Sequence, residues 1–221
     1  MDLSYIPILY IFYAHVVSYW VSCVTFFALD NLLEKEHITK YKFHTKITII
    51  QLVKSILNSV SNQLVMFVLF HTVSIYLPYE VNNHSINLFT LIMWLVLGDM
   101  YFYITHRLCH TYTPLYKAVH WYHHIHNDSP ICTTTIDSNV IENILVNVGA
   151  FLFGPYITYL LTLQVYDKLM VLWSIVFTVG GCMSHSGYKI LSENHAKHHI
   201  NGKCNFGFGL YLCDRIFNTF N

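Results

Sequence analysis

Nine of the 15 histidines in this chain form three tight clusters and one single, and the spacing within each cluster brings imidazole rings together. Residues three and four positions apart share a face of a helix, so each cluster directs two or three rings at one point. Neutral imidazole is the commonest protein ligand for transition metals, including iron, zinc and copper. Nine rings exceed what one tetrahedral site uses, so the pattern predicts two metal ions. The nine are His106, His110, His120, His123, His124, His185, His195, His198 and His199.

The spacing carries more weight than the number of histidines. A His-x-x-x-His pair is nearly expected at this density, whereas His-x-x-His-His should arise by chance about 0.07 times and is present twice. The alternative is a set of histidines that pack in the core without a ligand. The remaining six lack the spacing and are expected to be structural, although His126 lies close enough to the second cluster to assist it. These six are His15, His37, His44, His71, His84 and His126.

The type of ligand narrows the type of metal. Calcium and magnesium prefer oxygen ligands, and closed structural zinc sites often use thiolates. The six cysteines form no Cys-x-x-Cys pair, so we expect reduced, buried thiols. A zinc peptidase would need His-Glu-x-x-His, which the sequence lacks. Iron held by nitrogen ligands with open positions, next to a bilayer, favours oxygen activation and attack on an unreactive C–H bond.

Three acidic residues could orient these rings. Asp99 precedes His106 by seven residues and so lies on nearly the same helical face. A carboxylate in a membrane segment is costly unless it has a partner. Asp99 could accept the N–H of a ligating imidazole, or it could pair with Arg107 or a tyrosine hydroxyl. Glu142 and Asp214 are further candidates for the first role.

The composition indicates that a membrane surrounds these residues. The chain is 54% hydrophobic and only 11% charged, with a mean hydropathy of +0.43. Ordinary soluble domains are less apolar. The formal net charge is zero, which gives no reason to expect a nucleic acid partner. The expected fold is therefore an all-α integral membrane protein with about four to five transmembrane helices and a cytosolic, histidine-rich helical cap.

Apolar runs place the spans at residues 5–29, 56–77, 86–105, 144–163 and 169–184. Within the charged stretch 30–54, Phe43, Ile47 and Ile50 recur at helical spacing, which predicts a surface helix or a solvated loop. The last two spans form a returning hairpin. We treat the chain as one structural domain, with an N-terminal membrane region over 1–85 and a catalytic region over 86–221.

The placement of positive charge predicts the orientation. Eleven of the 12 Lys and Arg residues fall within 35–54, 107–117 or 189–215, and only Lys168 lies elsewhere. The positive-inside rule makes these three regions cytoplasmic. Because the hairpin crosses and returns, His185 and the last cluster lie on the same side as the first two clusters.

The clusters and their neighbours resemble the fatty acid hydroxylase/sterol desaturase superfamily, over roughly residues 90–220. Asp99 and Tyr103 precede the first box, Tyr116 and Val119 precede the second, and the last segment is most similar to the sterol hydroxylase and sterol C4-methyl oxidase branches. The matching motifs are His106-Arg107-Leu108-Cys109-His110, His120-Trp121-Tyr122-His123-His124, His185-Ser186-Gly187-Tyr188, His195-Ala196-Lys197-His198-His199, Asn205-Phe206-Gly207 and Asp214-Arg215-Ile216-Phe217.

The resemblance implies a di-iron monooxygenase of the endoplasmic reticulum. Its nine histidines would be metal ligands and catalytic residues, O2 would be the oxidant, and cytochrome b5 or a similar carrier would supply electrons. The substrate would be a membrane lipid such as a sterol or fatty acyl chain, hydroxylated or desaturated. No cytochrome b5 domain is fused to the chain, so we expect the electron donor to be a separate protein.

The sequence departs from the family pattern at two short motifs. Asn139-Val140-Ile141-Glu142 stands where His-Pro-x-Glu is usual, and Asn218-Thr219 stands where Gly-Thr is usual. A member that has lost activity is therefore one alternative. A metal transporter, or a membrane protein that only binds metal, is another. Transporter sites lie near the bilayer midplane, whereas these clusters lie at the membrane edge.

Overall fold

Long apolar helices make up most of the chain. The computed structural model describes residues 6–33, 40–43, 47–76, 87–126, 131–164 and 166–221. Five helical stretches are long and apolar enough to cross a membrane, which confirms the predicted all-α membrane fold. Within the described residues there is no strand, only one isolated bridge between Lys42 and Tyr188. The spanning helices are α1 (Ile6–Leu32), α3 (Ile49–Tyr76), α4 (Leu88–Thr111), the continuous α6 (Val140–Glu142), π-helical turn (Asn143–Val148) and α7 (Gly149–Thr162), and α8 (Asp167–Ser184).

Two boundaries differ from the sequence expectation. Helix α3 begins at Ile49, not at residue 56, so the predicted surface helix over 43–54 is wrong for its last six residues. Ile49 and Ile50 are exposed apolar side chains on this first turn, which suits a helix that faces lipid. Phe43 lies outside any helix, and its N–H donates to the Gly187 carbonyl. Helix α4 continues past residue 105 to Thr111 and carries the first histidine cluster.

The core of the bundle lies where α1, α4, α7 and α8 pack together. Trp94 and Trp173 are almost completely buried there, with Phe151 between the helices. The Trp94 indole N–H donates to Thr158 Oγ1 at 2.7 Å, and that of Trp173 to the Phe151 carbonyl at 2.8 Å. Such pairing matters in a membrane, where no water is available to satisfy a donor.

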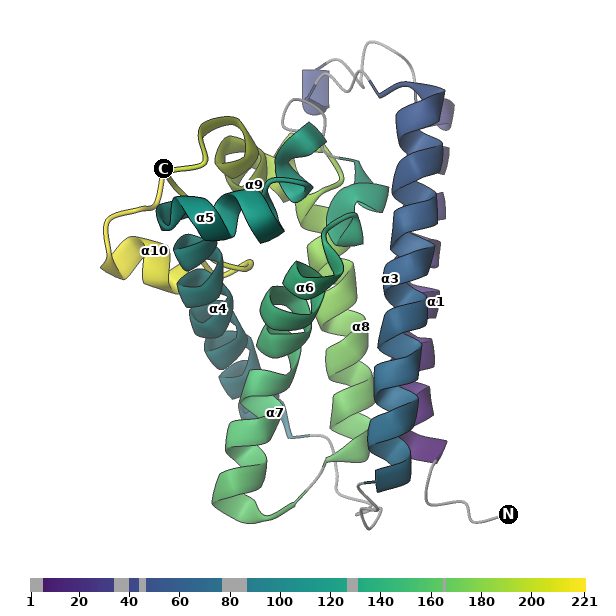
Figure 1. The fold of residues 1–221 in the computed structure, drawn as a ribbon, viewed down its shortest axis with the longest axis vertical. Helices are drawn as coiled ribbons and strands as arrows, with labels where there is room; N and C mark the ends of the chain where they lie inside the picture. Colours follow the sequence, from purple (N-terminus) through teal and green to yellow (C-terminus); the bar gives the residue numbers. More distant parts are fainter. Residues whose placement is uncertain (1–5, 34–39, 44–46, 77–86, 127–130, 165) are drawn as a thin grey trace.

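Helices α1 and α3 lie side by side at one edge of the bundle (Figure 1). Their outer faces carry large exposed apolar side chains, among them Val17, Phe27, Leu57 and Leu64. Exposed apolar stripes on two spanning helices are what a lipid-facing surface requires.

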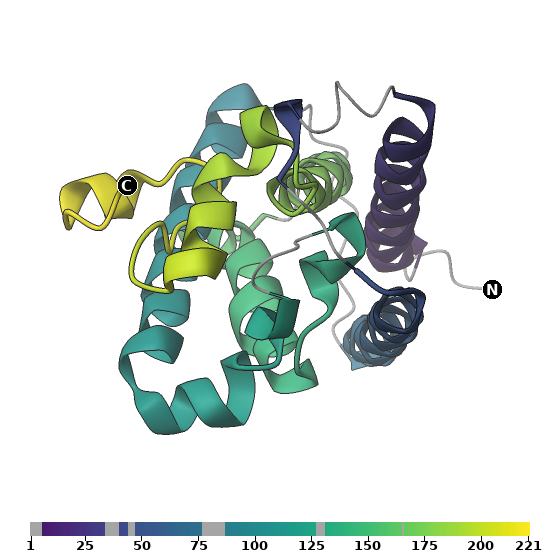
Figure 2. The same cartoon turned by 90° about the horizontal axis from the view of Figure 1, so that it is seen from above.

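The short elements gather at one end of the molecule (Figure 1). Viewed from that end, α1 and α3 stand to one side of the other spanning helices (Figure 2). Because α7 and α8 form a hairpin around Leu163, which has a positive φ of 56°, α8 returns the chain to this end. The short elements are α5 (Thr113–Leu115), the π-helix Tyr116–His120, the 3-10 turns His123–His126 and Cys132–Ile136, α9 (Lys189–Asn201) and α10 (Leu212–Ile216).

Close contact between α4 and α7 depends on Gly154. A Cβ atom on Gly154 would lie 2.8 Å from Trp94 Cα, which is too close for any side chain. We predict that Gly154→Ala lowers the free energy of unfolding by about 1–3 kcal/mol, because the backbones must move apart. Thermal unfolding of the purified protein in detergent measures this.

Gly180→Ala is the matched control. There, the added Cβ would lie 3.4 Å from Phe208 Cζ, an ordinary contact. We expect its melting temperature to stay near that of the wild type. Equal melting temperatures for wild type and Gly154→Ala would contradict the proposed helix contact.

Candidate metal centre

All nine predicted histidines meet at the end of the bundle where the short elements gather. They come from the last turns of α4, the segment after it, the residue following α8, and α9. Eight of the nine are buried, and His110 is half-buried. Their ring nitrogens form two groups, and within each group the nitrogens lie within 4.8 Å of one another. One group is His106, His110, His120, His124 and His198, and the other is His123, His185, His195 and His199.

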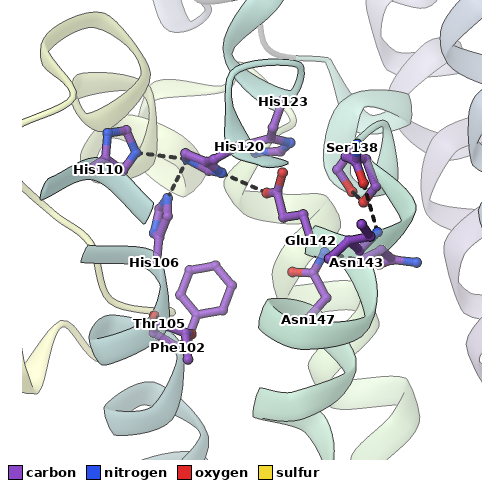
Figure 3. A network of polar contacts seen from close by, with 12 residues as sticks. Phe102, Thr105, His106, His110, His120, His123, Ser138, Glu142, Asn143 and Asn147 are labelled. Carbon is purple, nitrogen blue, oxygen red and sulfur yellow. Dashed lines mark hydrogen bonds and ion pairs between the residues drawn. The ribbon is translucent and has the colours of Figure 1, made fainter. Parts of the chain in front are cut away.

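The Nε2 atoms converge in the first group. His120 Nε2 lies 3.2 Å from His106 Nε2 and 2.8 Å from His110 Nε2 (Figure 3). The His198 Nε2 atom is buried and has no hydrogen-bond partner.

The second group has the same arrangement. His185 Nε2 lies 3.3 Å from His123 Nε2 and 3.0 Å from His195 Nε2. His195 Nε2 in turn lies 3.0 Å from His199 Nε2. Each group therefore brings several ring nitrogens to within ligand distance of one point.

Hydrogen bonds at the opposite side of the rings determine which nitrogen carries the proton. His106 Nδ1 lies 2.8 Å from the Phe206 carbonyl, and His198 Nδ1 lies 2.7 Å from the Cys204 carbonyl. His185 Nδ1 lies 3.1 Å from the Gly181 carbonyl. A carbonyl oxygen can only accept, so Nδ1 is the donor in each of these rings. In the neutral ring, Nε2 then has a free lone pair.

Burial keeps the rings neutral. It lowers the pKa of His185 to about 4. It also lowers the pKa of His120, His195, His198 and His199 well below 6.5, with a further contribution from the neighbouring imidazoles. At pH 7 these rings are therefore neutral, and the rings whose proton is held on Nδ1 direct an Nε2 lone pair into their group. Convergent imidazole lone pairs are a donor set that transition-metal ions prefer, so the two groups fit two such ions.

Glu142 orients one of the ligating rings. Its Oε1 atom accepts from His120 Nδ1 at 2.8 Å, and both side chains are buried (Figure 3). This is the contact that the sequence suggested for a carboxylate. Such a partner fixes the ring orientation and increases the basicity of the other nitrogen.

Asp99 has a different role from both sequence alternatives. It contacts no ligating imidazole, and the hydroxyl of Tyr103 receives its hydrogen bond from Arg107 instead. The Asp99 carboxylate accepts three backbone N–H groups at 2.8–3.1 Å, those of Phe208, Tyr211 and Leu212. The expectation of an imidazole partner was wrong because a loop distant in sequence folds onto this face of α4.

Asp214 holds the same loop, residues 202–211, from its other side. Its oxygens accept the backbone N–H of Phe206 at 2.9 Å and that of Gly207 at 2.6 Å. A Cβ on Gly207 would lie 2.8 Å from Asp214 Oδ2 and 3.0 Å from Asp99 Oδ1, so only glycine fits between the two carboxylates. Both carboxylates therefore act on the histidines through this loop, which supplies the Phe206 and Cys204 carbonyls. Sequence reasoning missed these carbonyls because every residue has one.

Of the other six histidines, the two whose side chains the structure describes join neither group. His15 Nδ1 lies 2.9 Å from Thr178 Oγ1, and the His71 ring stacks on Phe67 with 5.8 Å between centroids. The side chain of His126 and all of His37, His44 and His84 lie outside the described residues. The six cysteines are buried and free.

A largely apolar cavity reaches the second histidine group from inside the bundle. It runs between α1, α3, α7 and α8, with Ile11, Phe12, Met66 and Phe177 among its walls. His185 and His195 close one end. A separate polar opening reaches His110, His124 and His199. The centre therefore has an apolar approach on one side and a polar approach on the other.

Comparison with known proteins identifies the family. The fatty acid hydroxylase profile matches residues 90–219, which is more than half of the chain. The chain belongs to the fatty acid hydroxylase family. It is also 29% identical, over 94% of its length and 81% of the other sequence, to a protein of Dictyostelium discoideum named "Putative methylsterol monooxygenase". No solved structure was found to match the chain.

In this chain of the fatty acid hydroxylase family, asparagine replaces the histidine of His-Pro-x-Glu, and both histidine groups still form. Asn139 caps α6, where its side chain accepts the Ile141 N–H at 2.9 Å. Asn218, at the usual glycine, has a positive φ of 54°, a conformation that asparagine tolerates. Thr219 Oγ1 still donates to Asp214 at 2.7 Å.

Two substitutions on the same short segment separate capping from metal binding. We predict that Asn139→Ala lowers the free energy of unfolding by about 1 kcal/mol and leaves the metal content unchanged. Glu142→Leu should weaken metal binding by roughly 10–100-fold, because the His120 ring loses its acceptor. Elemental analysis after dialysis against graded chelator measures both. Loss of metal from Asn139→Ala would show that Asn139 supports the metal site.

Proposed function

We propose that this chain is a membrane-bound, non-haem di-iron oxygenase that hydroxylates or desaturates a lipid such as a sterol or a fatty acyl chain. The observation that carries the proposal is the convergence of nine imidazoles in two groups beside an apolar cavity. Membership of a family of metal-dependent hydroxylases supports the same reaction class. The name of the Dictyostelium relative favours a sterol within that class.

The residues of the chain have separate tasks in this proposal. The nine histidines hold two irons, which when bound would supply O2 activation and removal of hydrogen from an unreactive C–H bond. His185 and His195 bring one metal position to the end of the cavity, where a lipid carbon can lie next to it. The apolar walls exclude water from that carbon. A lipid would reach the cavity laterally, between the spanning helices.

The orientation and the partners follow from the charged end of the molecule. The basic residues of α9 and the segments around it lie at the histidine end, while Lys168 begins α8 at the other end. The positive-inside rule then supports a cytosolic position for the histidines in the endoplasmic reticulum membrane. Electrons would come from cytochrome b5 or a similar carrier, which approaches from that polar side.

Replacing one ligand should remove both metal and activity. We predict that His123→Ala lowers bound iron from two ions per chain and abolishes lipid oxidation, since its Nε2 belongs to the second group. Iron analysis and oxygen uptake on the same purified samples measure this. His71→Ala, on a spanning helix away from both groups, should keep its iron. Full oxidation by His123→Ala would refute the ligand assignment.

Lipid analysis of cells tests the reaction itself. Cells that express the wild-type chain should accumulate an oxidised lipid that is absent from cells expressing His123→Ala. A new alcohol indicates hydroxylation and a new alkene indicates desaturation. A wild-type protein that holds two irons and receives electrons, yet changes no lipid, would favour a member of the family that has lost its activity.

A further inference from the structure

The walls of the apolar cavity indicate an uncharged ligand. Among the described residues that line it, there is no lysine, arginine, aspartate or glutamate. A carboxylate or phosphate buried there would have no charged side chain to pair with, and such burial is strongly unfavourable. The cavity nevertheless has a few polar side chains, and these decide which uncharged lipid fits best.

Asn143 has a donor that no protein group uses. Its side chain is 1% exposed and lines the cavity. Oδ1 accepts from Asn147 Nδ2 at 3.1 Å, whereas Nδ2 has no hydrogen-bond partner. A buried N–H donor without an acceptor is destabilising, so its presence needs an explanation such as a ligand.

The local backbone presents this amide to the cavity. Asn143 begins the π-helical turn Asn143–Val148, inside an otherwise apolar spanning stretch. Both Asn143 and Asn147 line the cavity. Short π-helical turns occur frequently at functional sites, because the extra residue changes which side chains face inward. Polar groups inside a spanning segment are costly and usually serve a function.

Asn143 also lies next to the metal centre. The preceding residue, Glu142, accepts from His120 Nδ1, and Figure 3 shows Asn143 and Asn147 beside this contact. His185 and His195 line the same cavity. A ligand oxygen bound to Asn143 would therefore place neighbouring carbon atoms of the ligand toward the histidine groups.

We propose that Asn143 Nδ2 donates a hydrogen bond to a hydroxyl or carbonyl oxygen of an uncharged lipid, and so selects the lipid and the part of it that meets the metal centre. This inference rests on the proposed function, which makes the bound lipid a substrate, but binding of the lipid can be measured without turnover. The substrate class is a neutral lipid that already carries an oxygen close to the carbon to be oxidised.

Binding of matched lipids tests the proposal without turnover. The full chain, loaded with iron and incorporated into nanodiscs without a reductant, is titrated with radiolabelled cholestanol and cholestane, and with hexadecanol and hexadecane. We expect wild type to bind one alcohol roughly tenfold more tightly than its hydrocarbon, the effect of one buried hydrogen bond. The pair that shows the preference distinguishes a sterol from a linear lipid.

Asn143→Leu should bring that ratio close to one by weakening binding of the alcohol, with iron content unchanged. The ratio is measured within one sample, so incomplete folding does not affect it, and Asn143→Ala repeats the test if the leucine variant does not fold. Thr162→Val removes an exposed polar group at the end of the same spanning stretch, outside the cavity, and should keep the wild-type ratio.

Three results would overturn the proposal. They are a wild type without preference for either alcohol, an Asn143→Leu variant that keeps the preference, and loss of the preference in His15→Leu alone. Among the described residues that line the cavity, His15 also has a buried side-chain nitrogen, Nε2, without a hydrogen-bond partner. Its Nδ1 contacts Thr178 of α8, which precedes His185 by seven residues. Oxidation of a lipid without alcohol preference would overturn only this inference. Alcohol preference without any oxidation would overturn only the proposed function.

Discussion

The convergence of unprotonated imidazole nitrogens in a buried space is the constraint on which this end of the molecule depends. Carbonyl acceptors fix the protons of His106, His185 and His198 on Nδ1, so their lone pairs face other histidines. Without cations, that arrangement brings together like partial charges in a medium of low dielectric constant. Metal binding by these groups would therefore be thermodynamically coupled to folding of the short elements, as in other metal sites whose ligands come from separate elements.

The groups that orient the histidines are themselves held by buried carboxylates. Asp99 and Asp214 accept backbone N–H groups of the 202–211 loop, and this loop supplies carbonyls to His106 and His198. Several N–H groups that donate to one carboxylate hold the backbone of the loop in a single conformation. A chain with only 11% charged residues thus uses two of its acidic side chains to shape a loop. Gly207 fits between them because any side chain would collide with both.

Sequence reasoning succeeds here where the relevant property is local. Hydropathy located the five spans, and histidine spacing located every residue of both groups except the single His185. It could not assign the groups, because the second cluster divides: His120 and His124 belong to one group and His123 to the other. His120 and His124 are four residues apart and so lie on the same side of their segment. Which histidines of α9 each side meets depends on how α9 packs against this segment.

Tertiary contacts explain the errors. Asp99 does lie seven residues before His106 on α4, but the residues that contact it come from a loop more than 100 positions later in the chain. Helix α3 begins at Ile49 and so includes the charged residue Lys54. A helix near the membrane surface tolerates this single exposed lysine, because the long side chain can extend toward the surface. Neither feature has a signal in residue type or periodicity.

The division of the histidines would also make the two proposed metal positions chemically unequal. One group has five imidazoles and the other has four. A metal with fewer protein ligands has more coordination positions free for small molecules. The four-histidine group contains His185 and His195, the two that line the apolar cavity. The proposed lipid would therefore meet the position with more open coordination. The polar opening reaches both groups, through His110 and His124 of one and His199 of the other. Lipid and electrons would thus approach the histidines from different sides, and water kept off the lipid path would preserve selectivity for an apolar substrate.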